Sequence, residues 1–314
     1  MTFAFVFPGQ GSQSVGMMNG YTDLPVIQET FSEASDILKQ DLWSLVNNGS
    51  IDDLNLTVNT QPVMLTAGVA VYRAWTSLGG KKPAIIAGHS LGEYTALVAA
   101  EALTFADALA LVRYRAQAMQ QAVPEGKGGM AAILGLDDTS IETICREITA
   151  QSNGESLEPA NFNAPGQVVI AGHKSAIQQG IDLAKAKGAK RAIMLPMSIP
   201  SHCSLMKPAA EQMKQQLDKV TLHAPLLPIL HNADVKSHTN PATIKDILVQ
   251  QLVSPVRWVD TIQAIAANGV THVVECGPGK VLAGLNKRID QNLQQLSLAD
   301  SEAITQAVNQ LKVN

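Results

Sequence analysis

The chain has 314 residues, of which 46% are hydrophobic and 16% charged, and its formal net charge is −4. This composition excludes intrinsic disorder, and the slightly acidic balance argues against a nucleic-acid-binding protein. The three cysteines, Cys145, Cys203 and Cys276, are an odd number at wide spacing, which fits neither a disulfide framework nor a metal site.

Apolar runs of strand length alternate with amphipathic stretches of helix length, which is typical of an α/β protein. The first strand, Phe3–Phe7, is too short for a membrane span and lacks the basic flank of a signal peptide, so we expect a cytoplasmic protein. Further strands are predicted at Ala84–Ala87, Pro228–Leu230 and His272–Val274, and helices at about Pro62–Leu78, Leu91–Leu103 and Phe105–Val123. We therefore expect a large α/β-hydrolase-like domain with a central, mostly parallel sheet, formed by residues 1–126 and 197–314.

The middle of the chain has a different pattern, with the predicted order β-α-β-β-α-β of a ferredoxin-like unit. Its strands are expected at Met130–Leu134, Ala160–Asn163, Gln167–Ala171 and Arg191–Leu195, and its helices at Thr139–Ile148 and Ala176–Lys187. We expect residues 127–196 to form a small α+β domain inserted into the large one. The glycines of Gly126–Gly129 and the turn after Leu195 would be its hinges.

The strongest chemical signal is Gly88-His89-Ser90-Leu91-Gly92, which lies between a predicted strand and a predicted helix. A G-x-S-x-G sequence in this context is typical of a nucleophile elbow, where a sharp turn exposes the serine. The following helix N-terminus directs N–H groups and a positive dipole end toward an oxyanion. A simple glycine-rich turn is the alternative, but the placement favours Ser90 as a nucleophile.

A serine with its ordinary pKa needs a base, and the chain has seven histidines. His89 is next to the serine in sequence and should point elsewhere on an elbow. His202 lies at a predicted loop-to-helix junction and could reach the serine through the fold. Sequence alone ranks it only slightly above His173, His231 and His272.

Two glycine-rich loops do not match nucleotide-binding motifs. The loop Phe7–Gln13 has Ser14 where a dinucleotide fingerprint requires glycine, and Gly277-Pro278-Gly279-Lys280 lacks the Ser or Thr of a P-loop. An oxyanion donor from Gln10 and an ordinary tight turn are equally good interpretations of the first loop.

Five ordered motifs together resemble the malonyl-CoA:acyl carrier protein transacylase family of bacterial fatty acid synthesis. They are Phe7-Pro8-Gly9-Gln10-Gly11-Ser12-Gln13, Gly88-His89-Ser90-Leu91-Gly92-Glu93-Tyr94, Asn161-Phe162-Asn163-Ala164-Pro165-Gly166-Gln167, Pro200-Ser201-His202 and Glu275-Cys276-Gly277-Pro278-Gly279-Lys280. The resemblance extends over nearly the whole chain.

The resemblance implies the roles of the catalytic residues. Ser90 would be malonylated, and His202 would take its proton and pass one to the leaving CoA thiolate. The backbone carbonyl of Gln251 would orient His202, and no acidic residue occupies an evident triad position. Backbone N–H groups of Gln10 and Leu91 would form the oxyanion hole.

The substrate carboxylate requires a cation in a water-poor pocket, and arginine binds it with two parallel hydrogen bonds. Arg113 and Arg115 are about 200° apart on one helix, so only one can face the pocket, and the apolar stripe lies slightly nearer Arg115. The resemblance implies Arg115, which leaves Arg113 as a solvated arginine paired with a nearby acid. It also implies that Asn161 and Asn163 contact CoA or its pantetheine arm, although both could simply cap a strand and a turn.

The implied partners are malonyl-CoA and an acyl carrier protein, with no cofactor, no metal, no membrane and a monomeric enzyme. An acidic carrier would need a basic patch, and Lys185, Lys187, Lys190 and Arg191 form one candidate cluster. Lys280, Lys287 and Arg288 form the other. The alternatives are a discrete acyltransferase of a polyketide synthase, a serine thioesterase and a non-catalytic carrier-binding scaffold.

Overall fold

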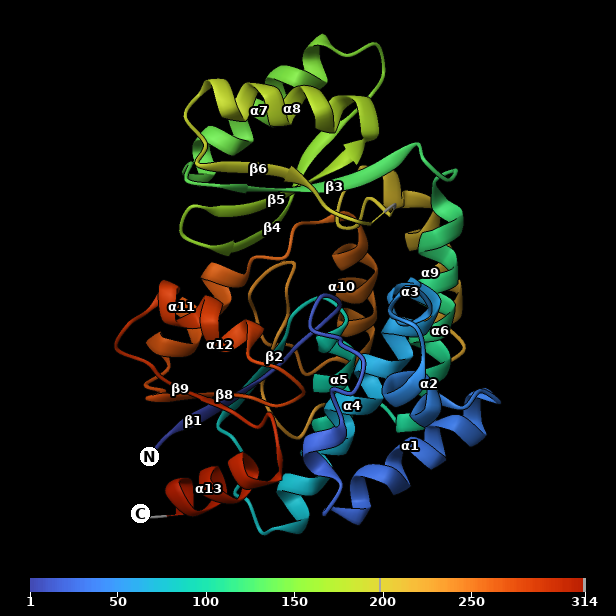
Figure 1. The fold of residues 1–314 in the computed structure, drawn as a ribbon, viewed down its shortest axis with the longest axis vertical. Coiled ribbons are helices and arrows are strands. Elements are labelled where there is room, and N and C mark those ends of the chain that lie inside the picture. The colour runs from blue at the N-terminus through green and yellow to red at the C-terminus, as the bar shows by residue number, and fades with distance from the viewer. Residues whose placement is uncertain (198, 313–314) are drawn as a thin grey trace.

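A parallel sheet of segments far apart in the sequence forms the centre of the larger part of the molecule (Figure 1). The computed structural model describes residues 1–197 and 199–312, and within them the strand order is β7-β2-β1-β8-β9. The strands are β1 (Phe3–Phe7), β2 (Ile85–Gly88), β7 (Ile229–Leu230), β8 (His272–Glu275) and β9 (Gln294–Ser297). All neighbouring strands are parallel, so the expected central sheet is present and, in its described strands, entirely parallel.

The side chains of β1 alternate between two cores, as the two-residue period of a strand requires. Phe3, Phe5 and Phe7 belong to the larger core, whereas Ala4 and Val6 belong to the core on the opposite face. The opposite face packs against α11 (Trp258–Ala267) and α12 (Val281–Ile289). The larger core includes residues of α1 (Pro25–Leu38), α2 (Leu42–Asn48), α3 (Ile51–Asn55), α4 (Thr57–Ser77), α5 (Gly92–Ala99), α6 (Phe105–Ala122), α9 (Lys207–Leu217), α10 (Pro241–Val253) and α13 (Ser301–Lys312).

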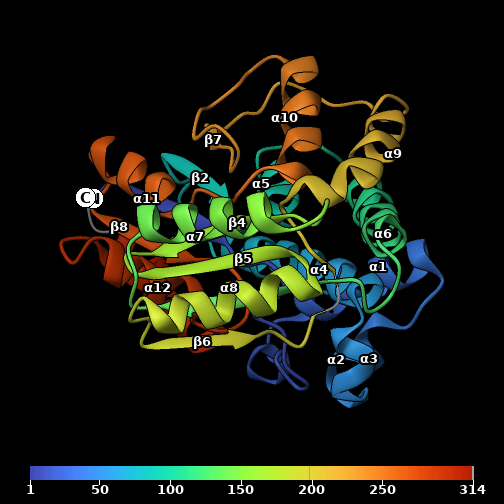
Figure 2. The ribbon, with the colours of Figure 1, turned by 90° about the horizontal axis from the view of Figure 1, so that it is seen from above.

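A second, antiparallel sheet lies above the first in Figure 1. Its order in the described residues is β4-β5-β3-β6, from β3 (Gly128–Leu134), β4 (Leu157–Ala164), β5 (Gln167–His173) and β6 (Arg191–Met194). The helices α7 (Asp138–Gln151) and α8 (Lys174–Ala186) lie on its outer face, as the view from above in Figure 2 shows. The element order is the β-α-β-β-α-β expected from the sequence. The domain limits of 127 and 196 stay a prediction.

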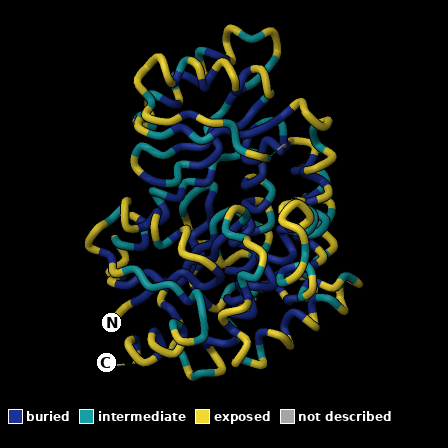
Figure 3. Tube along the Cα trace, in the orientation of Figure 1, coloured by how far each residue is buried: buried dark blue, intermediate teal, exposed yellow. Residues whose placement is uncertain are grey.

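Main-chain hydrogen bonds join β4 of the small sheet to the loop after α10. The N–H of Phe162 donates to the carbonyl of Val256 (3.0 Å), and the N–H of Val256 donates to the carbonyl of Ala160 (2.9 Å). In Figure 3 the trace is largely buried along the inner strands β1, β2, β3, β5 and β8, and the exposed residues lie mainly on outer loops, helix surfaces and edge strands such as β6. The small sheet is therefore fixed above the carboxyl ends of β1 and β2, where the elbow lies.

The first sixty residues contain elements that the hydrophobic pattern did not reveal. The loop after β1 leads into a short 3-10 helix at Asn19–Tyr21, followed by α1, α2 and α3. The helix α4 begins at Thr57, five residues before Pro62, where we expected it to begin. None of the helices in the described residues has the length and apolarity needed to cross a bilayer.

Candidate active site

Ser90 lies on a strained turn between β2 and α5. Its φ is +51°, in the left-handed region that non-glycine residues rarely adopt. A Cβ on Gly88 would be 1.9 Å from the backbone carbon of Gly92, and one on Gly92 would be 2.1 Å from the carbonyl oxygen of Phe7. Both flanking glycines are therefore required by close backbone approach, as in a nucleophile elbow.

The buried side chain of Asn232 clamps this turn. Its Oδ1 accepts a hydrogen bond from the N–H of Ser90 (2.7 Å), and its Nδ2 donates to the carbonyl of Gly88 (2.6 Å). Both bonds connect the elbow to the loop that follows β7. Because the N–H of Ser90 is occupied, it is not available to stabilise an oxyanion.

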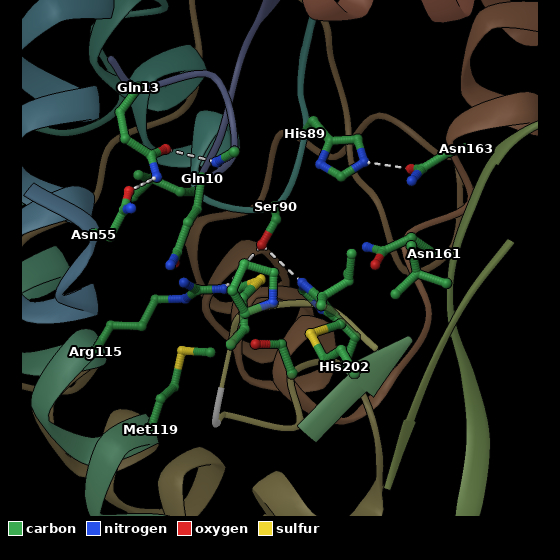
Figure 4. A pocket seen from close by; sticks show the side chains of 18 residues that line it. Gln10, Gln13, Asn55, His89, Ser90, Arg115, Met119, Asn161, Asn163 and His202 are labelled. Carbon is green, nitrogen blue, oxygen red and sulfur yellow. Dashed lines mark hydrogen bonds between the residues drawn. The ribbon is translucent and has the colours of Figure 1, made fainter. Parts of the chain in front are cut away.

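His202 is the histidine that reaches Ser90 (Figure 4). Its Nε2 lies 2.7 Å from the Oγ of Ser90, and its Nδ1 lies 2.8 Å from the backbone carbonyl of Gln251. A carbonyl only accepts, so Nδ1 carries the proton and Nε2 is free to accept the hydroxyl proton. The structure thus brings together all three groups that the sequence analysis connected.

The environment of His202 favours its neutral form. Burial, and after it the nearby positive charge of Arg115, lowers the pKa of this imidazole from 6.5 to about 3. A neutral imidazole is the form that can act as a base toward a serine hydroxyl. No other predicted candidate reaches the serine among the described residues: His173 accepts from the N–H of Ser156, and His231 bonds to Glu93.

The loop carrying His202 is held from the small sheet. His202 has a φ of +62°, and two residues later the N–H of Ser204 donates to the carboxylate of Glu158 on β4 (3.1 and 3.2 Å). The hydroxyl of Ser204 donates to the same carboxylate. This contact fixes the chain immediately after the base.

Arg115 places a buried cation beside the serine. It is only 1% exposed, and its Nη2 donates to the Oγ of Ser90 (3.3 Å) and to the Oε1 of Gln251 (3.0 Å). Its Nη1 donates to the Oε1 of Gln61 (2.9 Å), and burial lowers the pKa of the guanidinium. No described residue forms an ion pair with it. The charge is therefore open to an anionic ligand.

Arg113 differs from the expectation in its partner. It is half-buried and donates to the side-chain oxygen of Gln40, not to an acid. Gln40 in turn donates to Asn59 (3.0 Å), which connects α6 to the start of α4. The guanidinium of Arg113 therefore has the side-chain amide of Gln40 as its acceptor, because the turn between α1 and α2 lies beside it and not an acidic side chain.

The predicted residues meet in one pocket of about 330 Å³. Seven of the eight predicted residues line it, namely Gln10, Ser90, Leu91, Arg115, Asn161, Asn163 and His202. Gln251 is fully buried behind this lining. Figure 4 shows the side chains of Arg115 and His202 converging on Ser90 from opposite sides.

The two residues predicted for the oxyanion hole lie at the pocket wall. Leu91 immediately precedes the first residue of α5, where N–H groups have no partner in the helix. The side-chain amide of Gln10 donates to the hydroxyl of Thr57 (3.3 Å), so it is turned toward α4. The backbone N–H group is then the candidate donor at Gln10.

Asn161 and Asn163 lie on β4 and line the pocket from the small sheet. The Oδ1 of Asn163 accepts a hydrogen bond from Nε2 of His89 (2.8 Å), so His89 points away from Ser90 as expected. Burial lowers the pKa of His89. This bond connects the elbow residue to the opposite wall of the pocket.

The side chains of Gln61, Glu93 and Asn232 surround the site without a role predicted from the sequence, although Glu93 stands in the quoted motif. His231, a candidate base in the sequence, lies beside them and bonds to Glu93 instead of Ser90. Gln61 and Asn232 come from α4 and the loop after β7, where nothing in the local sequence signals a contact with Ser90. Among residues 1–197 and 199–312, no group of three His, Cys, Asp or Glu residues could hold a metal ion.

Comparisons with known proteins place this fold and site in a class. Residues 4–306 match the family described as the acyl transferase domain. The chain belongs to the acyl transferase family.

Within that class, the similar proteins are all named for malonyl transfer. A relative from Escherichia coli K12, 53% identical over 98% of both chains, is called malonyl CoA-acyl carrier protein transacylase. A crystal structure of an acyl-carrier-protein S-malonyltransferase from Burkholderia pseudomallei is 58% identical, with a TM-score of 0.96 over 98% of this chain and 100% of that one. A malonyl-transacylase in complex with a type II polyketide synthase acyl-carrier protein is 47% identical, with a TM-score of 0.96 over 99% and 100% of the chains.

Proposed function

We propose that the chain transfers the malonyl group from malonyl-CoA to the phosphopantetheine thiol of an acyl carrier protein through a malonyl-serine intermediate. The observation that carries this proposal is the contact of Ser90 with both a neutral histidine and a buried, unpaired arginine. One methylene separates the thioester carbonyl of malonyl-CoA from its free carboxylate. A cation that touches the nucleophile is therefore at the right range for that carboxylate.

The first half-reaction acylates the serine. The Oγ of Ser90 attacks the thioester carbonyl carbon while its proton moves to the Nε2 of His202. Backbone N–H groups of Gln10 and Leu91 stabilise the oxyanion of the tetrahedral intermediate. The carbon–sulfur bond then breaks, and His202 gives its proton to the CoA thiolate, which leaves malonyl-Ser90 and free CoA.

The second half-reaction runs through the same groups in reverse. The phosphopantetheine thiol gives its proton to the Nε2 of His202, and its sulfur attacks the ester carbonyl. The ester bond to the Oγ of Ser90 breaks, and this oxygen takes the proton back from His202. Arg115 holds the malonyl carboxylate throughout, while Asn161 and Asn163 contact the pantetheine arm from the small sheet. Every proposed step uses the chain's own residues and the two substrates, without a further cofactor.

The carbonyl that orients His202 distinguishes the proposed transfer from ester hydrolysis. A carbonyl fixes the tautomer but stabilises an imidazolium less than a carboxylate would. Simple esterases use Asp or Glu there and need no buried cation beside the serine. The absence of a bond between His202 and any described acid, together with Arg115, supports transfer of a carboxylated acyl group.

A second candidate has the same chemistry with a different carrier. The 47% identical complex with a polyketide synthase carrier favours a discrete acyltransferase of a polyketide synthase. We propose fatty acid synthesis as the process. Measuring malonyl transfer to a carrier protein of fatty acid synthesis and to one of polyketide synthesis tests this choice. The three buried free thiols fit the reducing cytoplasm, where we propose that the enzyme acts.

Intact-protein mass spectrometry tests the proposal. The wild type is mixed with malonyl-CoA or acetyl-CoA, Ser90→Ala is the control, and a holo-acyl carrier protein of fatty acid or polyketide synthesis is added last. We expect malonyl addition to the wild type alone, followed by discharge onto the fatty acid carrier. Release of CoA without a captured acyl group or transfer would identify a thioesterase, and no reaction would leave a carrier-binding scaffold.

A further inference from the structure

Glu93 is a fully buried acid that the proposed steps do not use. It lies in the first turn of α5, three residues after the nucleophile. Its carboxylate accepts from Nδ1 of His231 (2.6 Å), the N–H of Asn232 (3.1 Å) and Nε2 of Gln251 (2.8 Å). With the proton of His231 on Nδ1, all three partners are donors and the group is a carboxylate anion.

This anion sets the orientation of the Gln251 side-chain amide. The Nε2 of Gln251 donates to Glu93 and to the carbonyl of Ser90 (3.0 Å), and its Oε1 accepts from Arg115 (3.0 Å). Rotating the amide by half a turn would place its oxygen against the carboxylate and its NH₂ group against the guanidinium. Both contacts would be repulsive, so the charge of Glu93 selects the observed orientation.

The oriented amide in turn holds Arg115 at the nucleophile. The Nη2 that donates to Gln251 is the same atom that donates to the Oγ of Ser90. Glu93 therefore supplies a buried negative charge near Arg115 without an ion pair to it. This arrangement anchors the guanidinium and leaves its charge for the substrate.

We propose that Glu93 is a positioning residue for malonyl selection, which acts on Arg115 through the side chain of Gln251. The inference rests on the proposed function, because it assigns Arg115 to the malonyl carboxylate. The positioning of Arg115 by the Gln251 side chain is separate from the orientation of His202. His202 is oriented by the backbone carbonyl of Gln251, which no side-chain substitution removes. Losing Glu93 should therefore impair recognition of the carboxylate and spare the serine–histidine chemistry.

Single-turnover release of CoA at varied malonyl-CoA and acetyl-CoA concentrations tests this division. For Glu93→Gln we expect the half-saturating concentration of malonyl-CoA to rise by about ten- to a hundredfold, as for the loss of a charge-assisted hydrogen bond. The limiting rate with malonyl-CoA and the acylation by acetyl-CoA should change by less than about threefold. Gln251→Met, which keeps the backbone carbonyl but removes the amide that contacts Arg115, should raise the half-saturating concentration of malonyl-CoA to a similar extent.

The double variant identifies the route of the effect. If Glu93 acts through Gln251, Glu93→Gln combined with Gln251→Met should be no worse than the poorer single variant. Glu275→Gln is the matched control, because Glu275 is also a fully buried acid but accepts from the N–H groups of Leu282 and Ala283 at the start of α12. It should leave the ratio of malonyl to acetyl acylation unchanged.

Four results would count against the inference. An equal fall in acylation by malonyl-CoA and acetyl-CoA in Glu93→Gln, or additive effects in the double variant, would overturn the role of Glu93. If Glu93→Gln does not fold, Gln251→Met alone decides: an unchanged half-saturating concentration of malonyl-CoA would overturn it as well. If the wild type itself shows no preference for malonyl-CoA, the proposed function has failed, and with it the basis of the inference.

Discussion

The guanidinium of Arg115 donates to the hydroxyl oxygen of Ser90 across 3.3 Å, and both groups face the same pocket. A buried cation next to a nucleophile favours acyl groups that bring their own negative charge. An acyl group without a carboxylate leaves the guanidinium unpaired in a water-poor site, which is costly. The group that selects the acyl chain by its carboxylate is therefore in contact with the oxygen that attacks the thioester.

Replacing Arg115 should abolish selection of malonyl over acetyl. For Arg115→Ala we expect kcat/KM with malonyl-CoA to fall by at least about a hundredfold, because the partner of a buried carboxylate is lost. Arg115→Lys should recover only part of the loss, since an ammonium lacks the planar fork. The measurement is competition between malonyl-CoA and acetyl-CoA followed by mass spectrometry of the acyl-enzyme. A variant that kept the malonyl preference would show that the carboxylate binds elsewhere.

Acylation should resist acidification through the ordinary pKa range of histidine. Burial lowers the pKa of His202 from 6.5 to about 3, so its Nε2 stays unprotonated well below neutrality. We expect kcat/KM for a malonyl thioester of a short thiol to stay level from pH 8 to about pH 5. A decline centred near pH 6.5 would mean that His202 titrates normally and would contradict the assigned environment.

The same shift makes the folded state less stable in acid. Between pH 6.5 and about 3, His202 binds a proton in the unfolded chain but not in the folded one. The free energy of unfolding should therefore fall with falling pH by up to about 1.4 kcal/mol per pH unit from this group. Denaturant unfolding of the wild type and of His202→Gln at pH 7.5 and 5 measures it. The variant should show the smaller pH dependence.

The elbow should not tolerate a methyl group at Gly88. A Cβ there would be 1.9 Å from the backbone of Gly92, so Gly88→Ala should cost more than about 4 kcal/mol or prevent folding. Gly284→Ala is the matched control, because a Cβ at this position in α12 meets no atom within 4 Å. We expect it to stabilise the protein by about 0.5–1 kcal/mol. Thermal unfolding of the two variants provides the comparison, and similar transition temperatures would refute the assignment.

Charge reversal should locate the surface that receives the acidic carrier. Lys185→Glu with Lys190→Glu tests the small-sheet cluster, and Lys280→Glu with Lys287→Glu tests the cluster at α12. In the cluster that docks the carrier, reversal should raise the KM for the carrier by about fivefold or more and leave that for malonyl-CoA unchanged. The exposed Lys214 on α9 provides the control Lys214→Glu. A carrier KM that neither double variant alters would assign docking to another face.

The elements with a clear hydrophobic period were predictable, and so was the elbow. The helix expected at Phe105–Val123 is α6, Phe105–Ala122, because one apolar face and a Thr104 cap define it locally. The helices between β1 and Thr57 escaped prediction. The helices α2 and α3 have only seven and five residues, whereas the 14-residue α1 carries an amphipathic pattern and was predictable. Their stability comes from packing side chains such as Phe31 and Leu54 into the larger core.

The catalytic geometry required the fold as well as the sequence. Ser90 was evident from its motif, but nothing near His202 distinguishes it from His231, which lies buried one loop away and bonds to Glu93. The role of Asn232 depends on the pairing of β7 with β2, which brings a loop 142 residues distant to the N–H of Ser90. Long-range contacts of this kind leave no local pattern. The residues around Ser90 therefore could not be predicted from the sequence, although Ser90 itself could.

The connection between β4 and the loop after α10 consists of main-chain atoms on both sides. Backbone groups survive every substitution except one to proline, so the strand keeps its place whatever side chains it presents. Substitutions at Asn161 and Asn163 thus leave these two bonds in place, although one at Asn163 also removes the bond to His89, whereas Phe162 must retain its N–H group. Libraries of substitutions at positions 161 and 163 can change the shape of the pocket for other acyl thioesters without breaking the main-chain bonds that hold β4. Because main-chain bonds hold the strand and side chains line the pocket, natural substitutions at these positions can likewise change the acyl preference.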